Sequence, residues 1–323
     1  MINRNFENFC KSKNYELIKI LNFNKRKDSA ILLVRSQNEQ NFVIKLYGDN
    51  APKEIEKSFE IEINFYKSFN FDGIPKLFES GKNFFVLEYF DGLSLTELIK
   101  NFFIISNKFE KFDFNNLLSS PFDWFYSLQS GIYSANSNQK KLIIDSFLDR
   151  IGNLLTSGLK DSKKSKVESF FLRRFYKNNL KLLETGLTKM VESWINNNLK
   201  ILSFYGHNDL HSNNILVDET LSKIKLIDFE NIKSPGIWIC DIVYFYGTLY
   251  ALFSSKKELQ NKIKSSALNY ICSKEPNFNK IQIEIIIDIF CKAADSNSRF
   301  RLQNEGIKII KMFEYRNSVH SLV

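Results

Sequence analysis

The sequence predicts an α+β protein of two lobes, a small β-rich lobe over residues 1–90 and a larger α-helical lobe over residues 91–323. Three observations support this prediction. Short β-branched and aromatic runs, separated by polar turns, fill the first lobe. From Leu93 onward, apolar residues recur at the three-and-four spacing of amphipathic helices. A chain of 323 residues with 44% hydrophobic content is also long and apolar enough to bury the cores of two lobes.

The first lobe contains two predicted strands joined by a turn. Residues 29–35 and 41–47 are apolar, β-rich runs, and the polar segment 36–40 connects them. Lys45 lies in the second run with apolar neighbours on both sides. Taken alone, such a lysine is most simply an ordinary strand residue that faces solvent.

An amphipathic helix is predicted next, from Lys53 to about Phe69. Pro52 suits the first turn of a helix because its fixed backbone angle is already helical. The predicted apolar face consists of Phe59, Ile63, Tyr66 and Phe69. The helix carries the glutamates Glu56, Glu60 and Glu62. Most glutamates on an amphipathic helix are simply solvated.

A second strand pair is predicted at the end of the first lobe. Residues 74–80 and 83–90 are the two strands, and Gly81-Lys82 forms the turn between them. The pair ends at Asp91-Gly92, where the first lobe is predicted to end.

The second lobe is predicted to be mostly helical. It begins with a capping box, in which the side chains of Ser94 and Glu97 each bond the other residue's backbone N–H. The predicted helices cover residues 140–158, 166–199, 256–273, 279–294 and 299–316. Residues 119–122 and 134–138 are predicted loops.

The most informative stretch is HNDLHSNN at residues 207–214, followed by LIDFE at residues 226–230. Between them, the apolar run 215–217 suits a buried strand. The alternating run 224–227 suits its hairpin partner, and a polar turn connects the two. A hairpin brings its two ends together, so the motif residues at these ends are predicted to be neighbours.

The polar residues at the ends of this hairpin predict a phosphotransferase. Asp209 and Asn214 precede the first strand, and Asp228 follows the second. Phosphoryl transfer requires magnesium on the phosphates and a carboxylate that orients the attacking hydroxyl. Two acids and an amide supply the oxygen ligands that magnesium takes.

Two other interpretations of the same residues are weaker. His207, Asp209 and His211 could be metal ligands of a zinc hydrolase. A catalytic zinc usually takes three protein ligands including several imidazoles, and the chain has only one further histidine, His320. The segment 228–230 alone would suit a helix cap. Its position after the hairpin favours the phosphotransferase.

The spacing H-x-D-x-x-x-x-N followed by I-D-F-E resembles the catalytic core of the aminoglycoside phosphotransferase and choline kinase superfamily, which has a protein-kinase-like fold. The resemblance implies that Asp209 is the catalytic acid that engages the substrate hydroxyl. It implies that Asn214 and Asp228 bind Mg²⁺. It further implies that His207 braces the loop and that Asp241, before an apolar helix, supports the loop from behind.

The same resemblance implies roles for residues of the first lobe. Lys45 matches the lysine that contacts the phosphates, and Glu62 best matches the glutamate that pairs with it. Glu60 is the alternative partner. The backbone groups of Glu88 to Phe90 match the segment that bonds adenine.

Two departures from the family pattern concern the loops. Ser212-Asn213 replaces the more usual Pro-Gly of the catalytic loop. The segment 22–29, expected as a turn that leads into the first of these strands, contains no glycine, so the Gly-rich loop of protein kinases is absent. Ser29 and backbone amides are the candidates for contacting phosphate there, together with Lys25 or Lys27.

The implied function is an ATP- and Mg²⁺-dependent small-molecule kinase acting on a hydroxyl of an amino alcohol, sugar or aminoglycoside-like acceptor. The sequence alone does not distinguish these acceptors, because one core serves them all. The three tryptophans could form a cation-binding cage, or could lie in the core as such tryptophans more often do. They are Trp124, Trp194 and Trp238.

The alternative functions are a catalytically silent nucleotide-binding module and a kinase-fold enzyme that acts on protein. The complete set of two acids and an amide argues against the silent module. No A-P-E segment follows Asp228, which argues against a protein kinase.

The composition excludes other classes of protein. The net charge is +9, but the lysines are dispersed, so no nucleic-acid partner is expected. The four cysteines are far apart and lack a C-x-x-C pair, so we expect reduced thiols. No apolar run approaches ~20 residues, so no membrane span is expected and a cytoplasmic enzyme is predicted.

Overall fold

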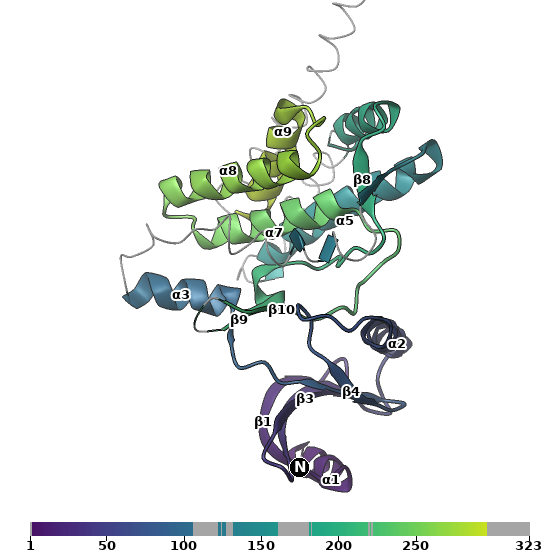
Figure 1. The fold of residues 1–323 in the computed structure, drawn as a ribbon, viewed down its shortest axis with the longest axis vertical. Coiled ribbons are helices and arrows are strands. Elements are labelled where there is room, and N and C mark those ends of the chain that lie inside the picture. The colour runs from purple at the N-terminus through teal and green to yellow at the C-terminus, as the bar shows by residue number, and fades with distance from the viewer. Residues whose placement is uncertain are drawn as a thin grey trace, which may run out of the picture. The chain divides into compact units, whose positions relative to one another are not determined.

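The computed structural model of the protein divides into two compact units, whose helices and strands are shown in Figure 1. The first unit combines Met1–Ile105 with Asn213–Ile232, and the second combines Ser106–Ser212 with Lys233–Val323. The structure describes residues 2–105, 122–123, 125–126, 132–160, 181, 183–218, 220 and 222–295. A domain boundary at residue 90 stays a prediction.

The first unit is built on a five-stranded antiparallel sheet with the strand order β1-β2-β3-β5-β4. The strands are β1 (Tyr15–Asn24), β2 (Ser29–Ser36), β3 (Asn41–Tyr47), β4 (Leu77–Ser80) and β5 (Phe84–Glu88). Helix α1 (Ile2–Ser12) packs against β1. The core on this side of the sheet contains Cys10, Ala30, Leu32, Val34, Phe42, Ile44, Leu46, Phe84 and Val86.

Strand β3 lies in the middle of this sheet and carries Lys45. In register, Lys45 lies opposite Phe85 of β5. Its neighbours Ile44 and Leu46 belong to the core that α1 borders. Because successive side chains of a strand alternate between the two faces, Lys45 projects from the opposite face.

Helix α2 (Lys53–Ser68) covers the face from which Lys45 projects. Its first turn follows Pro52, as the sequence predicts. Phe59 of the helix contacts Phe85 edge-on, with ring centroids 5.3 Å apart. The buried residues of α2 are Phe59, Glu62, Ile63, Phe65 and Tyr66. A glutamate among these aromatic and aliphatic residues requires a partner.

The first unit also contains a small second sheet with the order β10-β9-β6. Its strands are β6 (Leu93–Ser94), β9 (Ile215–Val217) and β10 (Ile224–Leu226), and the short helix η3 (Ser212–Asn214) precedes β9. Strands β9 and β10 form the predicted hairpin, with Ile215 opposite Leu226.

Helix α3 (Leu95–Ile105) begins with the predicted capping box. The Ser94 hydroxyl accepts a hydrogen bond from the Glu97 N–H at 3.2 Å. The Glu97 carboxylate accepts one from the Ser94 N–H at 3.1 Å.

The second unit is mainly helical. Strands β7 (Ile132–Ser134) and β8 (Lys200–Ser203) form a two-stranded sheet, and the short helix η2 (Ser137–Gln139) leads into α5 (Lys140–Lys160). Residues 183–196 are also helical. The later helices are α7 (Trp238–Leu252), α8 (Lys257–Lys274) and α9 (Lys280–Ala294). Helix α7 packs against α5, α8 and α9 and is buried along nearly its whole length.

Two of the three tryptophans lie in the core of the second unit. The side chains of Trp194 and Trp238 are fully buried. The indole N–H of Trp194 donates to Gln282 Oε1 at 2.8 Å, and that of Trp238 donates to the Lys200 carbonyl at 2.9 Å. These two residues are therefore core residues, and they do not present a cage to a ligand. Trp124 lies outside the described residues.

The α+β class with a β-rich first part and helical second part is confirmed. Strand β1 extends to Asn24, so the expected turn at 22–29 is shorter than predicted. Ser134, expected in a loop, ends strand β7. The predicted helix 299–316 lies outside the described residues, as does much of 166–199. Within the described ranges, no helix has both the length and the apolar character needed to cross a membrane.

Candidate active site

The centre of the first unit is an ion-pair cluster around Lys45. Its ammonium group lies 2.9 Å from both carboxylate oxygens of Glu62 and 2.7 Å from Asp228 Oδ1. Burial alone would lower the pKa of Lys45, but these two carboxylates raise it above its ordinary value. The lysine is therefore fixed as a cation between two acids.

Glu62 is the glutamate that the structure pairs with Lys45, whereas Glu60 on the same helix is exposed. Burial raises the pKa of Glu62 to about 7, although the charge of Lys45 lowers it in part. Glu62 Oε1 also accepts a hydrogen bond from the Phe229 N–H at 3.2 Å. The Phe229 ring stacks on Phe65 with centroids 4.2 Å apart, which ties this segment to α2.

Asp228 and Asn214 lie at the same end of the β9–β10 hairpin. The Ile227 N–H donates to the Asn214 carbonyl at 3.0 Å. The backbone of Asp228 has a φ of 68°, in the left-handed region that residues other than glycine rarely adopt. Such strained positions cluster at functional sites, where surrounding contacts hold them. The ion pair with Lys45 is one such contact.

A cavity of about 130 Å³ adjoins this cluster within the first unit. Lys45 and Asp228 line one part of it, and the ends of β1 and β2 line another through Asn24 and Ser29. Lys27, also in the lining, forms an ion pair of 3.6 Å with Glu230. The Asn24 side chain accepts hydrogen bonds from the N–H groups of the next turn. These hydrogen bonds to Asn24 stabilise the glycine-free turn between β1 and β2 at the edge of the cavity.

Glu88 and Phe90 lie where the first sheet ends. Strand β5 ends at Glu88, whose N–H donates to the Lys76 carbonyl at 2.8 Å and is thus bonded within the protein. The Glu88 carboxylate accepts a hydrogen bond from Lys225 Nζ at 3.0 Å. Phe90 follows outside regular secondary structure and is partly buried. Lys225 also donates to the Ile74 carbonyl, so it connects the two sheets of the unit.

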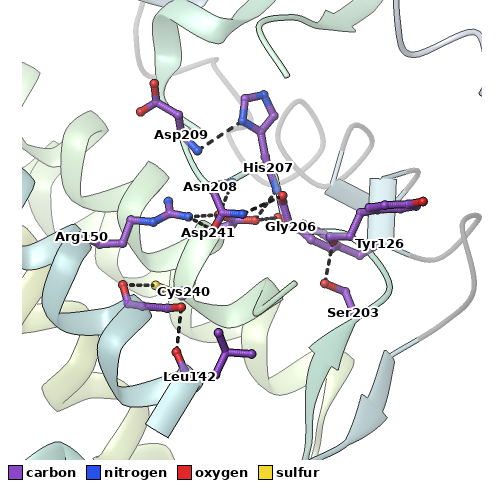
Figure 2. Close-up of polar contacts among 12 residues, drawn as sticks. Tyr126, Leu142, Arg150, Ser203, Gly206, His207, Asn208, Asp209, Cys240 and Asp241 are labelled. Carbon is purple, nitrogen blue, oxygen red and sulfur yellow. Dashed lines mark hydrogen bonds and ion pairs between the residues drawn. The ribbon is translucent and has the colours of Figure 1, made fainter. Parts of the chain in front are cut away.

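The other predicted residues belong to the second unit, where Asp241 organises the loop that carries Asp209 (Figure 2). Asp241 is 1% exposed, in the first turn of α7. Its carboxylate accepts hydrogen bonds from the N–H groups of His207 at 2.8 Å and Asn208 at 3.1 Å. It also accepts one from the Tyr126 hydroxyl at 2.9 Å. The carboxylate thus fixes the backbone immediately before Asp209.

His207 and Asp209 differ in exposure, which fits different roles. The His207 side chain is fully buried, and its Nδ1 accepts a long hydrogen bond of 3.4 Å from the Asp209 N–H. The Asp209 side chain is 32% exposed, with His211 Nε2 3.8 Å away. Burial, and then the charge of Asp209, raise the pKa of Tyr244 to about 12. The Asp209 carboxylate is therefore partly accessible to solvent, whereas the His207 side chain beside it is buried.

Sequence reasoning missed Arg150, although a signal was present. Arg150 follows Phe147 by three residues and precedes Leu154 by four, and both of these are buried on α5. Residues at these spacings share one face of a helix, so Arg150 belongs to the apolar face. A charge on such a face indicates a buried partner, which proves to be Asp241.

Comparisons with known proteins agree with this fold. A model of the ecdysteroid kinase-like family matches residues 121–265, less than half of the chain. Comparison by sequence with curated proteins gives no match. A choline kinase from Cryptosporidium parvum Iowa II is similar over 98% of this chain and 97% of its own, with a TM-score of 0.51 and 11% identity. The gentamicin complex of APH(2")-IIa is similar over 96% of this chain and 94% of its own, with a TM-score of 0.50 and 14% identity.

At these identities, structural similarity establishes the fold. The protein therefore has the protein-kinase-like fold that its motifs predict, shared with a choline kinase and with APH(2")-IIa in its gentamicin complex. Within this fold the structure brings Lys45, Glu62 and Asp228 into one cluster, and places His207 and Asp241 directly around the loop of Asp209.

Proposed function

We propose that the protein is an ATP-dependent small-molecule kinase, a phosphotransferase that moves the γ-phosphate to a hydroxyl group. The observation that carries this proposal is the cluster in which one partly buried lysine, Lys45, contacts both Glu62 and Asp228. Phosphoryl transfer depends on cations and carboxylates in fixed positions more than on covalent catalysis. Because ATP is the proposed phosphate donor, we also propose that the reaction takes place in the cytoplasm.

The first unit supplies the groups that bind the nucleotide. Lys45 binds the phosphates, and Glu62 holds Lys45 in place. The cavity of about 130 Å³ beside them accommodates phosphate groups. The backbone near Glu88 and Phe90 contacts the base, with the Glu88 carboxylate fixed by Lys225.

The donors at the hairpin end fit Mg²⁺. Asp228 offers a carboxylate that is 32% exposed, and Asn214 offers an amide oxygen. These are hard oxygen donors, and Mg²⁺ commonly takes one or two protein ligands together with phosphate oxygens. When bound, Mg²⁺ neutralises charge on the phosphates. Lys45, already paired with Asp228, adds a second positive charge in the same unit.

The second unit supplies the group that acts on the acceptor. An Asp209 carboxylate oxygen accepts the proton of the acceptor hydroxyl and orients the hydroxyl oxygen for attack. Asp241 keeps this loop in place through the backbone N–H groups of His207 and Asn208.

The acceptor is proposed to be a small molecule that carries a hydroxyl group. One structural relative is named for choline, another holds gentamicin, and the matching family model is named for ecdysteroids. An amino alcohol, a sugar or an aminoglycoside-like molecule is therefore the proposed acceptor class. A steroid alcohol belongs in the same test.

The test is magnesium-dependent ADP release in the presence of pooled acceptors, namely choline, ethanolamine, sugars, an aminoglycoside and an ecdysteroid. D209N should abolish acceptor-stimulated release and leave nucleotide binding intact. D228A should weaken binding of the metal–nucleotide complex itself. D145N is the matched control, because Asp145 is an exposed aspartate of α5 that pairs with Lys141.

The outcomes separate the proposed function from its alternatives. Release that depends on an acceptor and is lost in D209N supports the small-molecule kinase. Tight nucleotide binding without turnover by any acceptor would instead favour a silent binding module. The mass of the product distinguishes a phosphorylated metabolite from phosphorylated protein.

A further inference from the structure

Arg150 is a buried arginine that contacts the loop of Asp209 from a distant helix. It lies in the middle of α5 and is 4% exposed. Its Nη2 donates to the Asn208 side-chain oxygen at 2.7 Å and to Asp241 Oδ1 at 2.9 Å (Figure 2). One guanidinium nitrogen thus bonds both the loop and the carboxylate that supports the loop.

The charge of Arg150 matters because Asp241 is buried. The other three donors to this carboxylate are neutral: the Tyr126 hydroxyl and the N–H groups of His207 and Asn208. A buried carboxylate requires a compensating charge as well as hydrogen bonds. Arg150 supplies that charge through its ion pair with Asp241.

Arg150 also stabilises the strained residue directly before Asp209. Asn208 has a φ of 63°, in the left-handed region. Its side chain donates to the Gly206 carbonyl at 3.0 Å and accepts from Arg150. Protein kinases carry arginine at this place in their H-R-D motif. Here the place is taken by asparagine, and an arginine reaches it from α5.

A second contact of Arg150 leads to the Asp209 side chain. The guanidinium carbon lies 5.2 Å from the centroid of the Tyr244 ring, within the range of a cation–π interaction. Tyr244 lies three residues after Asp241 on α7, and burial together with the charge of Asp209 raises the pKa of its hydroxyl. Arg150 therefore contacts the residues that fix the backbone before Asp209, and also an aromatic ring whose hydroxyl is influenced by the charge of Asp209.

We propose that Arg150 is a positioning residue, which orients Asp209 through Asn208 and Asp241 on one side and through Tyr244 on the other. This inference rests on the proposed kinase activity, and it identifies Arg150 as a residue that influences the rate of the proposed phosphoryl transfer. Nucleotide-binding residues lie in the other unit, so loss of Arg150 should lower kcat and leave KM for ATP nearly unchanged.

A role in stability alone would not require an arginine here. The same face of α5 carries Phe147, Ile151 and Leu154, all buried. Buried ion pairs contribute little to stability compared with well-packed apolar residues. The contacts of Arg150 lie at the loop of Asp209. This indicates that Arg150 positions the loop and does not mainly stabilise the core.

The first experiment measures hydrogen exchange of the loop in full-length protein, with wild type, R150K, R150M and Y244F. R150M should speed exchange at the amides of residues 207 and 208, which donate to Asp241, while α8 and α9 keep wild-type protection. K264M is the control: Lys264 is a half-buried cation of the same unit, paired with Asp288 and near Tyr250. Wild-type loop protection in R150M would overturn the proposal.

The second experiment measures steady-state kinetics with ATP and whichever acceptor supports turnover. R150M should lower kcat about 10²-fold, the effect of a small displacement of a catalytic group. R150K, which retains the charge, should recover part of this loss, and Y244F should lower kcat without changing the melting temperature. A kcat that falls only in proportion to the folded fraction would overturn the positioning role. If wild type shows no turnover, the proposed function fails, whereas hydrogen exchange still decides the role of Arg150 in the loop.

Discussion

The buried carboxyl of Glu62 leads to a prediction about stability and pH. Its pKa rises from 4.5 to about 7 in the folded protein, first because of burial. Between these two values the folded state holds a proton that the unfolded chain has lost. Stability from this group is therefore fully present below pH 4.5 and is lost as the pH rises through about 7. The variant E62Q, which cannot titrate, should lack this dependence.

The magnitude follows from the same two pKa values. At about 1.4 kcal/mol per pH unit, the full difference corresponds to roughly 3 kcal/mol. Most of it falls between about pH 5 and about pH 8, where we expect a change of about 2–3 kcal/mol. Lys45 stays protonated in both states across this range, because its pKa is raised from 10.5. The change should therefore come from Glu62 and not from its partner.

Urea unfolding of wild type and E62Q across this pH range measures the prediction. Each stability is extrapolated to water, and the difference between the two proteins is followed with pH, so that titrating groups that do not interact with Glu62 cancel. As the pH rises, the free energy of unfolding of E62Q should increase relative to that of wild type by about 2–3 kcal/mol. E60Q is the matched control, because Glu60 is exposed on the same helix. A difference between wild type and E62Q that stays constant with pH would refute the reasoning.

Substitutions at Gly236, Asn279 and Trp194 test the second unit further. G236A should lower the urea midpoint by the equivalent of about 1–3 kcal/mol, because an added Cβ would lie 2.1 Å from the Gly206 nitrogen; an unchanged midpoint would contradict this close approach. N279A should cost about 1 kcal/mol in thermal unfolding, since the Asn279 side chain accepts two N–H groups at the start of α9, and N279D should retain most of that stability. W194F should cost about 1–3 kcal/mol by leaving buried Gln282 without its donor, and W194F/Q282L should recover part of it.

Elements that depend on near neighbours were predicted well from the sequence. Strand β3 spans Asn41–Tyr47, the predicted residues. The capping box at Ser94 and Glu97 formed as expected, because both of its hydrogen bonds are local. The hairpin of β9 and β10 follows from two short apolar runs and the polar turn between them. In each case the residues that determine the strand, cap or hairpin lie within it or a few residues from it in the sequence.

The partners of buried charges could not be predicted in the same way. Arg150 and Asp241 are 91 residues apart in sequence, and Lys225 and Glu88 are 137 apart. A charge on an apolar face shows that a partner exists but does not name it. Tertiary packing also decides that Glu62, and not Glu60, pairs with Lys45, because the orientation of α2 on the sheet determines which glutamate faces the lysine.

The two units use the same physical device next to their acids. Asp228 has a left-handed backbone and contacts a partly buried lysine, Lys45. Asn208 has a left-handed backbone directly before the proposed catalytic acid and contacts a buried arginine, Arg150. Such a backbone costs of order 1–2 kcal/mol outside glycine, and Asp and Asn tolerate it best because their short side chains find local hydrogen bonds. Here each cation instead gives the strained residue a hydrogen bond from a part of the chain distant in sequence. The cations therefore stabilise these strained local conformations beside the two carboxylates that we propose take part in phosphoryl transfer.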